Sequence, residues 1–127
     1  MIAVDTSALV AIVLDEPQAD ACIAALETAD EILISAATAA ESLIVAARRG
    51  VYEEMKSLIA NLGLNVISVT QASAERVAQI YARWGKGNHS AGLNFGDCFA
   101  YDVAKAHGCA LLYVGDDFAK TDIAAVA

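Results

Sequence analysis

Short apolar runs alternate along the chain with longer stretches in which apolar residues recur at helical spacing. The apolar runs of strand length are 2–4, 32–34, 64–69 and 110–114. The stretches with helical character are about 7–14, 17–28, 37–49, 52–62, 71–84 and 94–107. Strands that alternate with helices predict an α/β fold, in which a parallel sheet of four to five strands is flanked by helices on both faces. The fifth strand would be a short edge strand at 123–126.

Glycines and one loop separate these elements. Gly50, Gly63 and Gly108 directly follow predicted helices, where glycine supplies the left-handed stop. Residues 85–92, GKGNHSAG, are dense in glycine, asparagine and serine and are predicted to form a loop. Because no linker, internal repeat or low-complexity tract interrupts the pattern, residues 1–127 are predicted to form one domain.

The composition is typical of a cytoplasmic protein. No stretch reaches the ~18–20 uninterrupted apolar residues that a membrane-spanning helix needs. The apolar N-terminus lacks a basic leader and carries Asp5, so it makes a poor signal peptide. Cys22, Cys98 and Cys109 are odd in number and lack metal-site spacing, which indicates reduced thiols.

The net charge of the chain is −8, which bears on its partners. This charge argues against bulk electrostatic binding of nucleic acid. It is compatible with a nuclease whose acids hold cations, and equally with a protein that binds a basic segment of a partner. Charge alone does not choose between these classes.

Four acidic residues stand out by their positions in the predicted elements. Asp5 and Asp116 lie where apolar strands end, and Glu41 and Asp97 lie near the starts of helices. Strand carboxyl ends and the following helix N-termini share one edge of a parallel sheet, so these side chains are expected to converge. Converging carboxylates repel one another unless a cation neutralises them, and oxygen ligands favour Mg²⁺ or Mn²⁺. Such a site activates water and stabilises the charge of a phosphodiester under attack.

Two of these acids also have purely structural interpretations near helix starts. Asp5 is a suitable cap for the helix that follows it. Thr38 and Glu41 have the spacing of a capping box, in which the two residues satisfy the backbone at the start of a helix. The sequence alone leaves both interpretations open.

The remaining acids have equally ordinary alternatives. Asn94 is a plausible N-cap, and Asp97 then falls in the first helical turn, where the helix dipole favours a negative charge. Asp116 and Asp117 are common residue types in turns. A further pair, formed by residues 102 and 105 three positions apart on a helix, is expected to be a surface ion pair between an aspartate and a lysine.

Three long segments of the chain resemble a known family. They are IAVDTSALVAIVLDEP at the start, ISAATAAESLIVAARRG after the second strand, and LNFGDCFAYDVAKAHGCALLYVGDDFAKTDI near the end. Together they resemble the PIN-domain ribonucleases, and within these the VapC-type toxins of bacterial toxin–antitoxin pairs. The resemblance spans almost the whole chain.

The resemblance implies a function and a set of site residues. The residues that would correspond to the acidic metal site are Asp5, Glu41, Asp97 and Asp116, with Asp117 and Asp122 as less certain neighbours. The residues that would support it are Thr6, Ser7 and Asn94. The resemblance also implies Mg²⁺- or Mn²⁺-dependent endonucleolytic cleavage of RNA, such as tRNA or rRNA. It further implies a homodimer and a cognate antitoxin that inserts an arginine-bearing segment near the acids.

The chain departs from this expectation in having few basic residues that would hold RNA. The candidates are Arg48, Arg49, Arg83 and Lys86. One alternative function is a non-catalytic partner-binding module whose acids hold a partner's arginines. Another is a receiver-like phosphoacceptor domain, which requires an aspartate after its third strand. Here residues 64–69 lead to threonine and glutamine, so this alternative ranks low.

Overall fold

The computed structural model describes residues 1–126, and a parallel sheet lies at its centre. The strands are β1 (Ile2–Val4), β2 (Ile32–Ser35), β3 (Asn65–Ile67) and β4 (Ala110–Leu112). Their order in the sheet is β3-β2-β1-β4, and every pairing between them is parallel. The chain thus moves outward from β1 to β3 and then returns to place β4 on the other side of β1. This order differs from the 2-1-3-4-5 order of receiver domains, which argues against the phosphoacceptor alternative.

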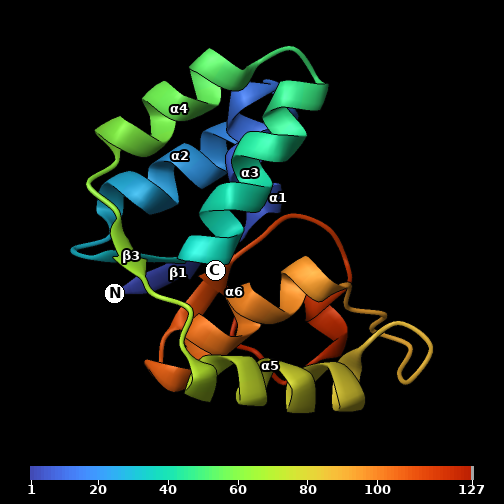
Figure 1. Cartoon of the computed structure of the whole chain (residues 1–127). Coiled ribbons are helices and arrows are strands. Elements are labelled where there is room, and N and C mark those ends of the chain that lie inside the picture. The colour runs from blue at the N-terminus through green and yellow to red at the C-terminus, as the bar shows by residue number, and fades with distance from the viewer. Residues whose placement is uncertain (127) are drawn as a thin grey trace.

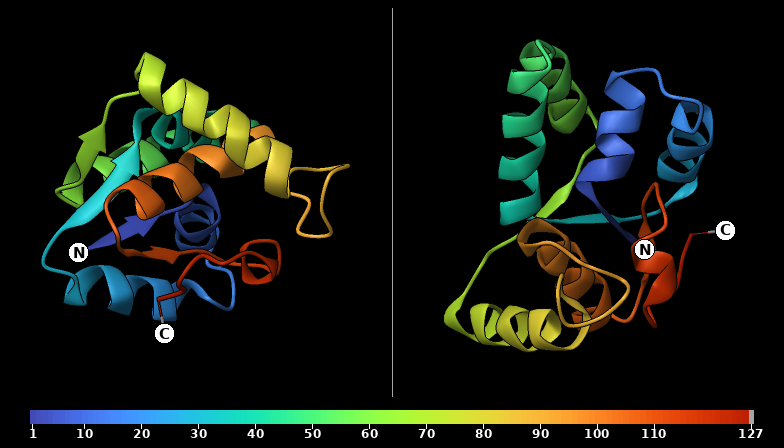
Figure 2. Two further views of the ribbon diagram at one scale, coloured as in Figure 1. Left: turned by 90° about the horizontal axis from the view of Figure 1, so that it is seen from below. Right: turned by 90° about the vertical axis from the view of Figure 1, so that its right-hand side faces the viewer.

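Helices cover both faces of the sheet (Figure 1). They are α1 (Thr6–Val13), α2 (Ala19–Thr28), α3 (Ala36–Arg48), α4 (Tyr52–Asn61), α5 (Gln71–Trp84), α6 (Phe95–Ala106) and the 3₁₀ helix η1 (Phe118–Lys120). Figure 2 shows α1 to α4 on one side of the sheet and α5 with α6 on the other. The predicted fold, an α/β domain with helices on both faces, is therefore confirmed. Within residues 1–126, no helix combines the length and apolar character needed to cross a membrane.

The two layers of helices bury alternate residues of the strands. Leu33 of β2 and Leu111 of β4 belong to the core shared with α5 and α6. Their neighbours Ile34 and Leu112 belong to the opposite core, beneath α1 to α4. Because successive side chains in a strand point to opposite faces, these short apolar runs contribute to two cores at once.

The edges of the sheet differ from the sequence-based expectation. The third strand, expected over 64–69, spans only Asn65–Ile67 and leaves Val66 half exposed. At the other edge, Ala125 forms a parallel bridge to Leu111 instead of a fifth strand. The Leu111 N–H donates to the Ala124 carbonyl at 2.8 Å, and one such bridge suffices to cover part of the β4 edge.

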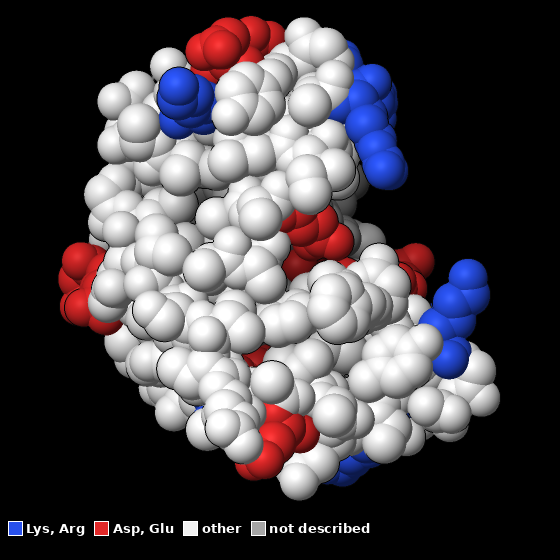
Figure 3. All heavy atoms as spheres, viewed as in Figure 1, with Lys and Arg blue, Asp and Glu red and all other residues white. Residues whose placement is uncertain are grey.

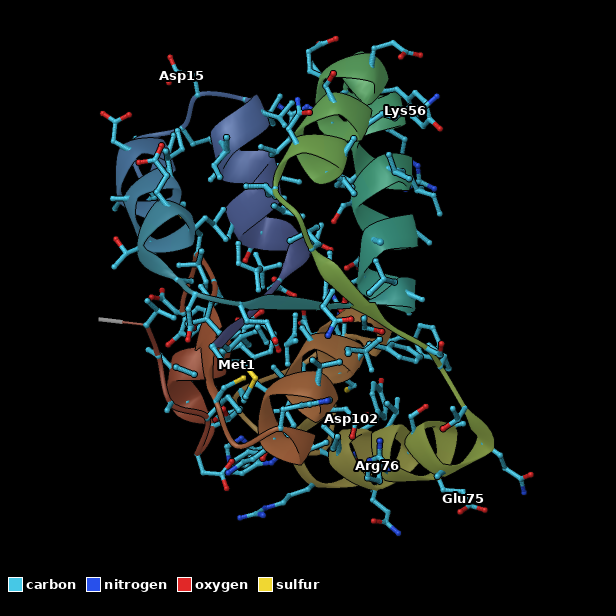
Figure 4. The ribbon with its side chains drawn as sticks, turned by 90° about the vertical axis from the view of Figure 1, so that its left-hand side faces the viewer. Met1, Asp15, Lys56, Glu75, Arg76 and Asp102 are labelled. Atoms are coloured by element: carbon cyan, nitrogen blue, oxygen red, sulfur yellow. The ribbon has the colours of Figure 1, made fainter. Side chains whose placement is uncertain are left out.

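An ion pair between an exposed arginine and a buried aspartate joins α5 to α6. The Arg76 guanidinium donates from Nε to Asp102 Oδ1 at 2.7 Å and from Nη2 to Oδ2 at 3.1 Å, and Figure 4 shows the two side chains facing each other. Asp102 is 5% exposed, whereas Lys105 forms its ion pair with Asp122 at 3.1 Å. The expected surface pair between residues 102 and 105 is therefore wrong. The carboxylate of residue 102 points into the helix interface, where the α5 arginine compensates its charge.

We expect Arg76→Ala to lower the free energy of unfolding by about 2 kcal/mol, because the Asp102 carboxylate would stay buried without a partner. Chemical denaturation at neutral pH measures this change. Gln79→Ala, an exposed change on the same helix, is the matched control and should alter stability by less than about 0.5 kcal/mol. Equal effects of the two substitutions would contradict the proposed compensation.

Candidate functional site

The order in which strands are added to the sheet reverses at β1, because β2 and β3 lie on one side of it and β4 lies on the other. A pocket lies at the carboxyl ends of β1 and β4. Its volume is about 230 Å³. Its lining residues are Asp5, Ser7, Asn94, Asp97, Val114, Gly115, Asp116, Asp117 and Phe118. In open α/β sheets, such a reversal point is where ligands bind. Three of the four acids singled out in the sequence therefore line one pocket, and Figure 3 shows acidic side chains in a hollow of the surface.

Asp5 is the most buried acid of this pocket, at 3% exposure. Its Oδ2 caps α1 by accepting from the Ser7 N–H at 3.0 Å and from the Ser7 hydroxyl at 2.7 Å. Its Oδ1 is buried without a hydrogen-bond partner in the described chain. Burial raises the pKa of Asp5 to about 6, against the opposing hydrogen bonds from Ser7, and the charge of Glu41 adds to the rise. Asp5 thus caps α1 and lines the acidic pocket at the same time.

Ser7 also ties the first helix to the end of β4. Its hydroxyl oxygen accepts a hydrogen bond from the Val114 N–H at 3.0 Å, across 107 positions of the sequence. Gly115 follows with φ +105°, a conformation that side-chain-bearing residues rarely adopt. This turn places Asp116 and Asp117 at the pocket that contains Asp5. The supporting position expected for Ser7 therefore has a definite structural basis.

Asp97 enters the pocket from the first turn of α6. The Asn94 N–H donates to Asp97 Oδ2 at 3.0 Å, and the Asp97 N–H donates to Asn94 Oδ1 at 2.8 Å, so the two residues form a capping box. The pKa of Asp97 is raised to about 7. Burial is the main cause, and the charges of Asp5, Glu41 and Asp117 raise the pKa further against the hydrogen bond from Asn94.

Glu41 lies beside this pocket but is not among the residues that line it. The Thr6 hydroxyl donates to Glu41 Oε1 at 2.6 Å. The proposed capping box of Thr38 with Glu41 is wrong, because α3 begins earlier and its N-cap is Ser35. Glu41 therefore sits in the second turn of α3, where its charge acts on both Asp5 and Asp97.

Ser42 is a supporting residue that sequence reasoning did not identify. Its hydroxyl is fully buried and lies 3.2 Å from Thr6 Oγ1 and 2.8 Å from the Thr38 carbonyl oxygen. It thereby fixes the hydroxyl that holds Glu41. A buried serine directly after a candidate acid carries no distinctive sequence signal, because serine is equally common on helix surfaces.

Asp122 lies outside the acidic pocket. It accepts a hydrogen bond from the Tyr101 hydroxyl and forms an ion pair with Lys105. These two contacts and the nearby charge of Arg83 lower the pKa of Asp122. This cluster borders a larger groove of about 440 Å³ between α5 and α6, where the Arg83 guanidinium stacks 4.4 Å from the centre of the Trp84 ring. The acids of this groove are already neutralised by cations, so the smaller acidic pocket is the better candidate for a functional site.

The chemistry of the acidic pocket fits a hard divalent cation. All of its charged ligands are carboxylates, and one buried oxygen, Asp5 Oδ1, has no partner within residues 1–126. The raised pKa values of Asp5 and Asp97 mean that burial and neighbouring acids destabilise their ionised carboxylates. A bound cation would stabilise these ionised forms. Across the same residues, no three His, Cys, Asp or Glu side chains are grouped closely enough to form a complete metal-binding cluster.

Comparison with known proteins assigns the chain to a family. The family model described as "PIN domain" matches residues 2–124. Ribonuclease VapC30 of Mycobacterium tuberculosis is 42% identical over 127 residues, covering 98% of this chain and 97% of the relative. Ribonuclease VapC of Mycolicibacterium smegmatis is 42% identical over 128 residues, with 97% and 98% coverage. The chain therefore belongs to the PIN domain family and, within it, to the VapC ribonucleases.

Solved structures agree with this fold. The VapC20 toxin of Mycobacterium tuberculosis, described as cleaving the sarcin–ricin loop, superposes with a TM-score of 0.82 at 17% identity and covers 99% of this chain and 98% of its own. A toxin–antitoxin complex from Klebsiella pneumoniae gives a TM-score of 0.73 at 19% identity, with 96% and 93% coverage. VapBC2 from Rickettsia felis, bound to promoter DNA, gives 0.74 at 16% identity, with 100% and 98% coverage. At these identities the likeness concerns the fold.

We expect Asp97→Asn to stabilise the metal-free protein at pH 7.5, by about 1 kcal/mol once screening of this partly exposed group is allowed for. The pKa of Asp97 rises from 3.8 in the unfolded chain to about 7 in the folded one, so the folded state binds the proton more tightly. Stability of the wild type therefore falls as pH rises through this window. Thermal unfolding in chelator at pH 4 and pH 7.5 measures the effect, which should vanish at pH 4. If the difference in stability between Asp97→Asn and the wild type is the same at both pH values, the raised pKa of Asp97 is contradicted.

Proposed function

We propose that this protein is a metal-dependent RNA endonuclease and the toxin of a toxin–antitoxin pair. The observation that carries the proposal is the buried Oδ1 of Asp5, which has no hydrogen-bond partner among residues 1–126 and belongs to a pocket shared with Asp97 and Asp116. Membership of the VapC ribonucleases supplies the reaction class. The proposal is thus supported by a site that suits cations and by relatives that are named ribonucleases.

Mg²⁺ or Mn²⁺ would be held by Asp5, Asp97 and Asp116, with Glu41 contributing through a water or a second ion. Such an ion, when bound, lowers the pKa of a water molecule and stabilises the charge of a phosphodiester under attack. The chain's own residues orient the carboxylates. Ser7 and Asn94 each hold one oxygen of an aspartate, and the Thr6 hydroxyl holds Glu41. The hydrogen bonds leave the second oxygen of each aspartate available to a ligand.

The RNA substrate would cross the acidic hollow between basic side chains. Figure 3 shows lysine or arginine side chains on both sides of the hollow. Arg48 and Arg49 are exposed at the end of α3. Because Arg48 follows Glu41 by seven positions, Arg48 and Glu41 lie on the same face of that helix. Arg83 is a weaker candidate, because its guanidinium stacks on Trp84 in the α5–α6 groove. With few phosphate contacts available, cleavage should depend only weakly on salt.

The partner in this proposal is an antitoxin that neutralises the acidic pocket with a basic segment. Two solved neighbours of the same fold are described as a toxin–antitoxin complex from Klebsiella pneumoniae and as DNA-bound VapBC from Salmonella typhimurium. A partner arginine in the pocket would form charge-assisted bonds with carboxylates that now repel one another. A homodimer, which would align two such sites along one substrate, completes the proposal.

Cleavage of RNA by the purified, antitoxin-free protein tests this function. We expect discrete fragments from total tRNA and rRNA in Mg²⁺ or Mn²⁺ and none in chelator. Asp97→Asn should lower the cleavage rate at least about 100-fold, because it removes a charged ligand while retaining the α6 cap. Gel analysis of end-labelled RNA over a time course measures these rates.

Asp20→Asn is the matched control, because Asp20 is exposed on α2 and away from the pocket. It should cleave as the wild type does. If folded, metal-loaded wild type cleaves no RNA, the endonuclease assignment fails and the acids serve partner binding instead. If Asp97→Asn stays fully active, the assignment of the site fails while the reaction class stands.

A further inference from the structure

Gly96, the second residue of α6, lies directly against the Glu41 carboxylate of α3. A Cβ atom placed on Gly96 would be 2.0 Å from Glu41 Oε2, 2.6 Å from its Cδ and 2.9 Å from its Oε1. Real Cβ atoms essentially never come within 3.0 Å of another heavy atom of this kind. The position of the Glu41 carboxylate therefore requires that residue 96 has no side chain.

The backbone itself does not require glycine here. The glycines with positive φ in the described chain include Gly92 and Gly115 on either side of α6, whereas Gly96 has ordinary helical geometry. Alanine is preferred over glycine in a helix by up to about 1 kcal/mol. Local propensity thus favours another residue at this position, and the contact with Glu41 is the structural reason for a glycine.

The Glu41 carboxylate is also held by α1. The Thr6 hydroxyl donates to Oε1 at 2.6 Å, and the buried Ser42 hydroxyl lies 3.2 Å from Thr6 Oγ1. Glu41 therefore contacts both a hydrogen-bond donor of α1 and the backbone of α6 at Gly96. The residue after Gly96 is Asp97, whose pKa the charge of Glu41 raises.

We propose that Gly96 is a positioning residue of the acidic site, whose missing side chain lets Glu41 reach the first turn of α6 beside Asp97. The proposal rests on the proposed function only where it concerns metal binding. In Gly96→Ala, the end of the flexible Glu41 side chain is displaced and its hydrogen bond from Thr6 is broken, because this displacement costs less than a shift of the α6 backbone. The fold and the Asp97 cap are retained.

A double-mutant cycle in chelator tests the steric part without any metal. Its members are the wild type, Gly96→Ala, Glu41→Ala and the double variant, and thermal unfolding is the measurement. With Glu41 absent, Gly96→Ala should raise the melting temperature by about 3 °C, the gain expected from helix propensity. With Glu41 present, the gain should disappear, because the Thr6–Glu41 hydrogen bond is lost. Equal shifts in both backgrounds would overturn the proposal.

Titration of the same four proteins with Mn²⁺ tests the functional part. Gly96→Ala should weaken Mn²⁺ binding about 10-fold, the size of effect seen when a positioning partner of a metal site is lost. In the Glu41→Ala background it should have no further effect. An equal loss in both backgrounds would show that Gly96 acts independently of Glu41 and would overturn the proposal. Absence of Mn²⁺ binding by the wild type would instead refute the proposed metal function, with the steric coupling still decided by the unfolding cycle.

Discussion

The electrostatic repulsion among carboxylates at the β1–β4 reversal is the constraint on which the organisation of this protein depends. Asp5 and Asp97 carry raised pKa values because burial and neighbouring acids disfavour their charged forms. A fold that gathers such groups needs a rigid frame around them. Two apolar cores supply it, one on each face of the sheet, so that strand ends and helix starts are fixed where the acids meet.

The site is assembled from ordinary helix-capping chemistry. Asp5 Oδ2 caps α1, and Asp97 Oδ2 forms the capping box of α6 with Asn94. In both aspartates, the capping bonds in the described chain use one oxygen and orient the other. A structural role and a functional role are therefore compatible in the same side chain, and the cap determines the direction in which the remaining oxygen points.

Much of the fold and several site residues follow from local patterns. The alternation of strands with helices predicts the α/β class, and acids that follow strands predict where the pocket lies. Local patterns fail where distant partners compete. Lys105 is three residues from Asp102, yet Arg76 from α5 binds that aspartate and Lys105 binds Asp122. Thr38 has capping-box spacing to Glu41, yet Ser35 starts the helix one turn earlier.

The sequence by itself determined the class of fold and three acids that line the pocket, because periodicity and residues at strand ends are local properties of the chain. The resemblance of three long segments to the PIN-domain ribonucleases indicated the family. The tertiary structure decided how those acids are held. The bond from the Val114 N–H to Ser7 spans 107 positions, and the contact of Glu41 with Gly96 joins two helices. Such contacts depend on how the helices pack against the sheet, and distances between packed elements are not encoded in any single stretch of sequence.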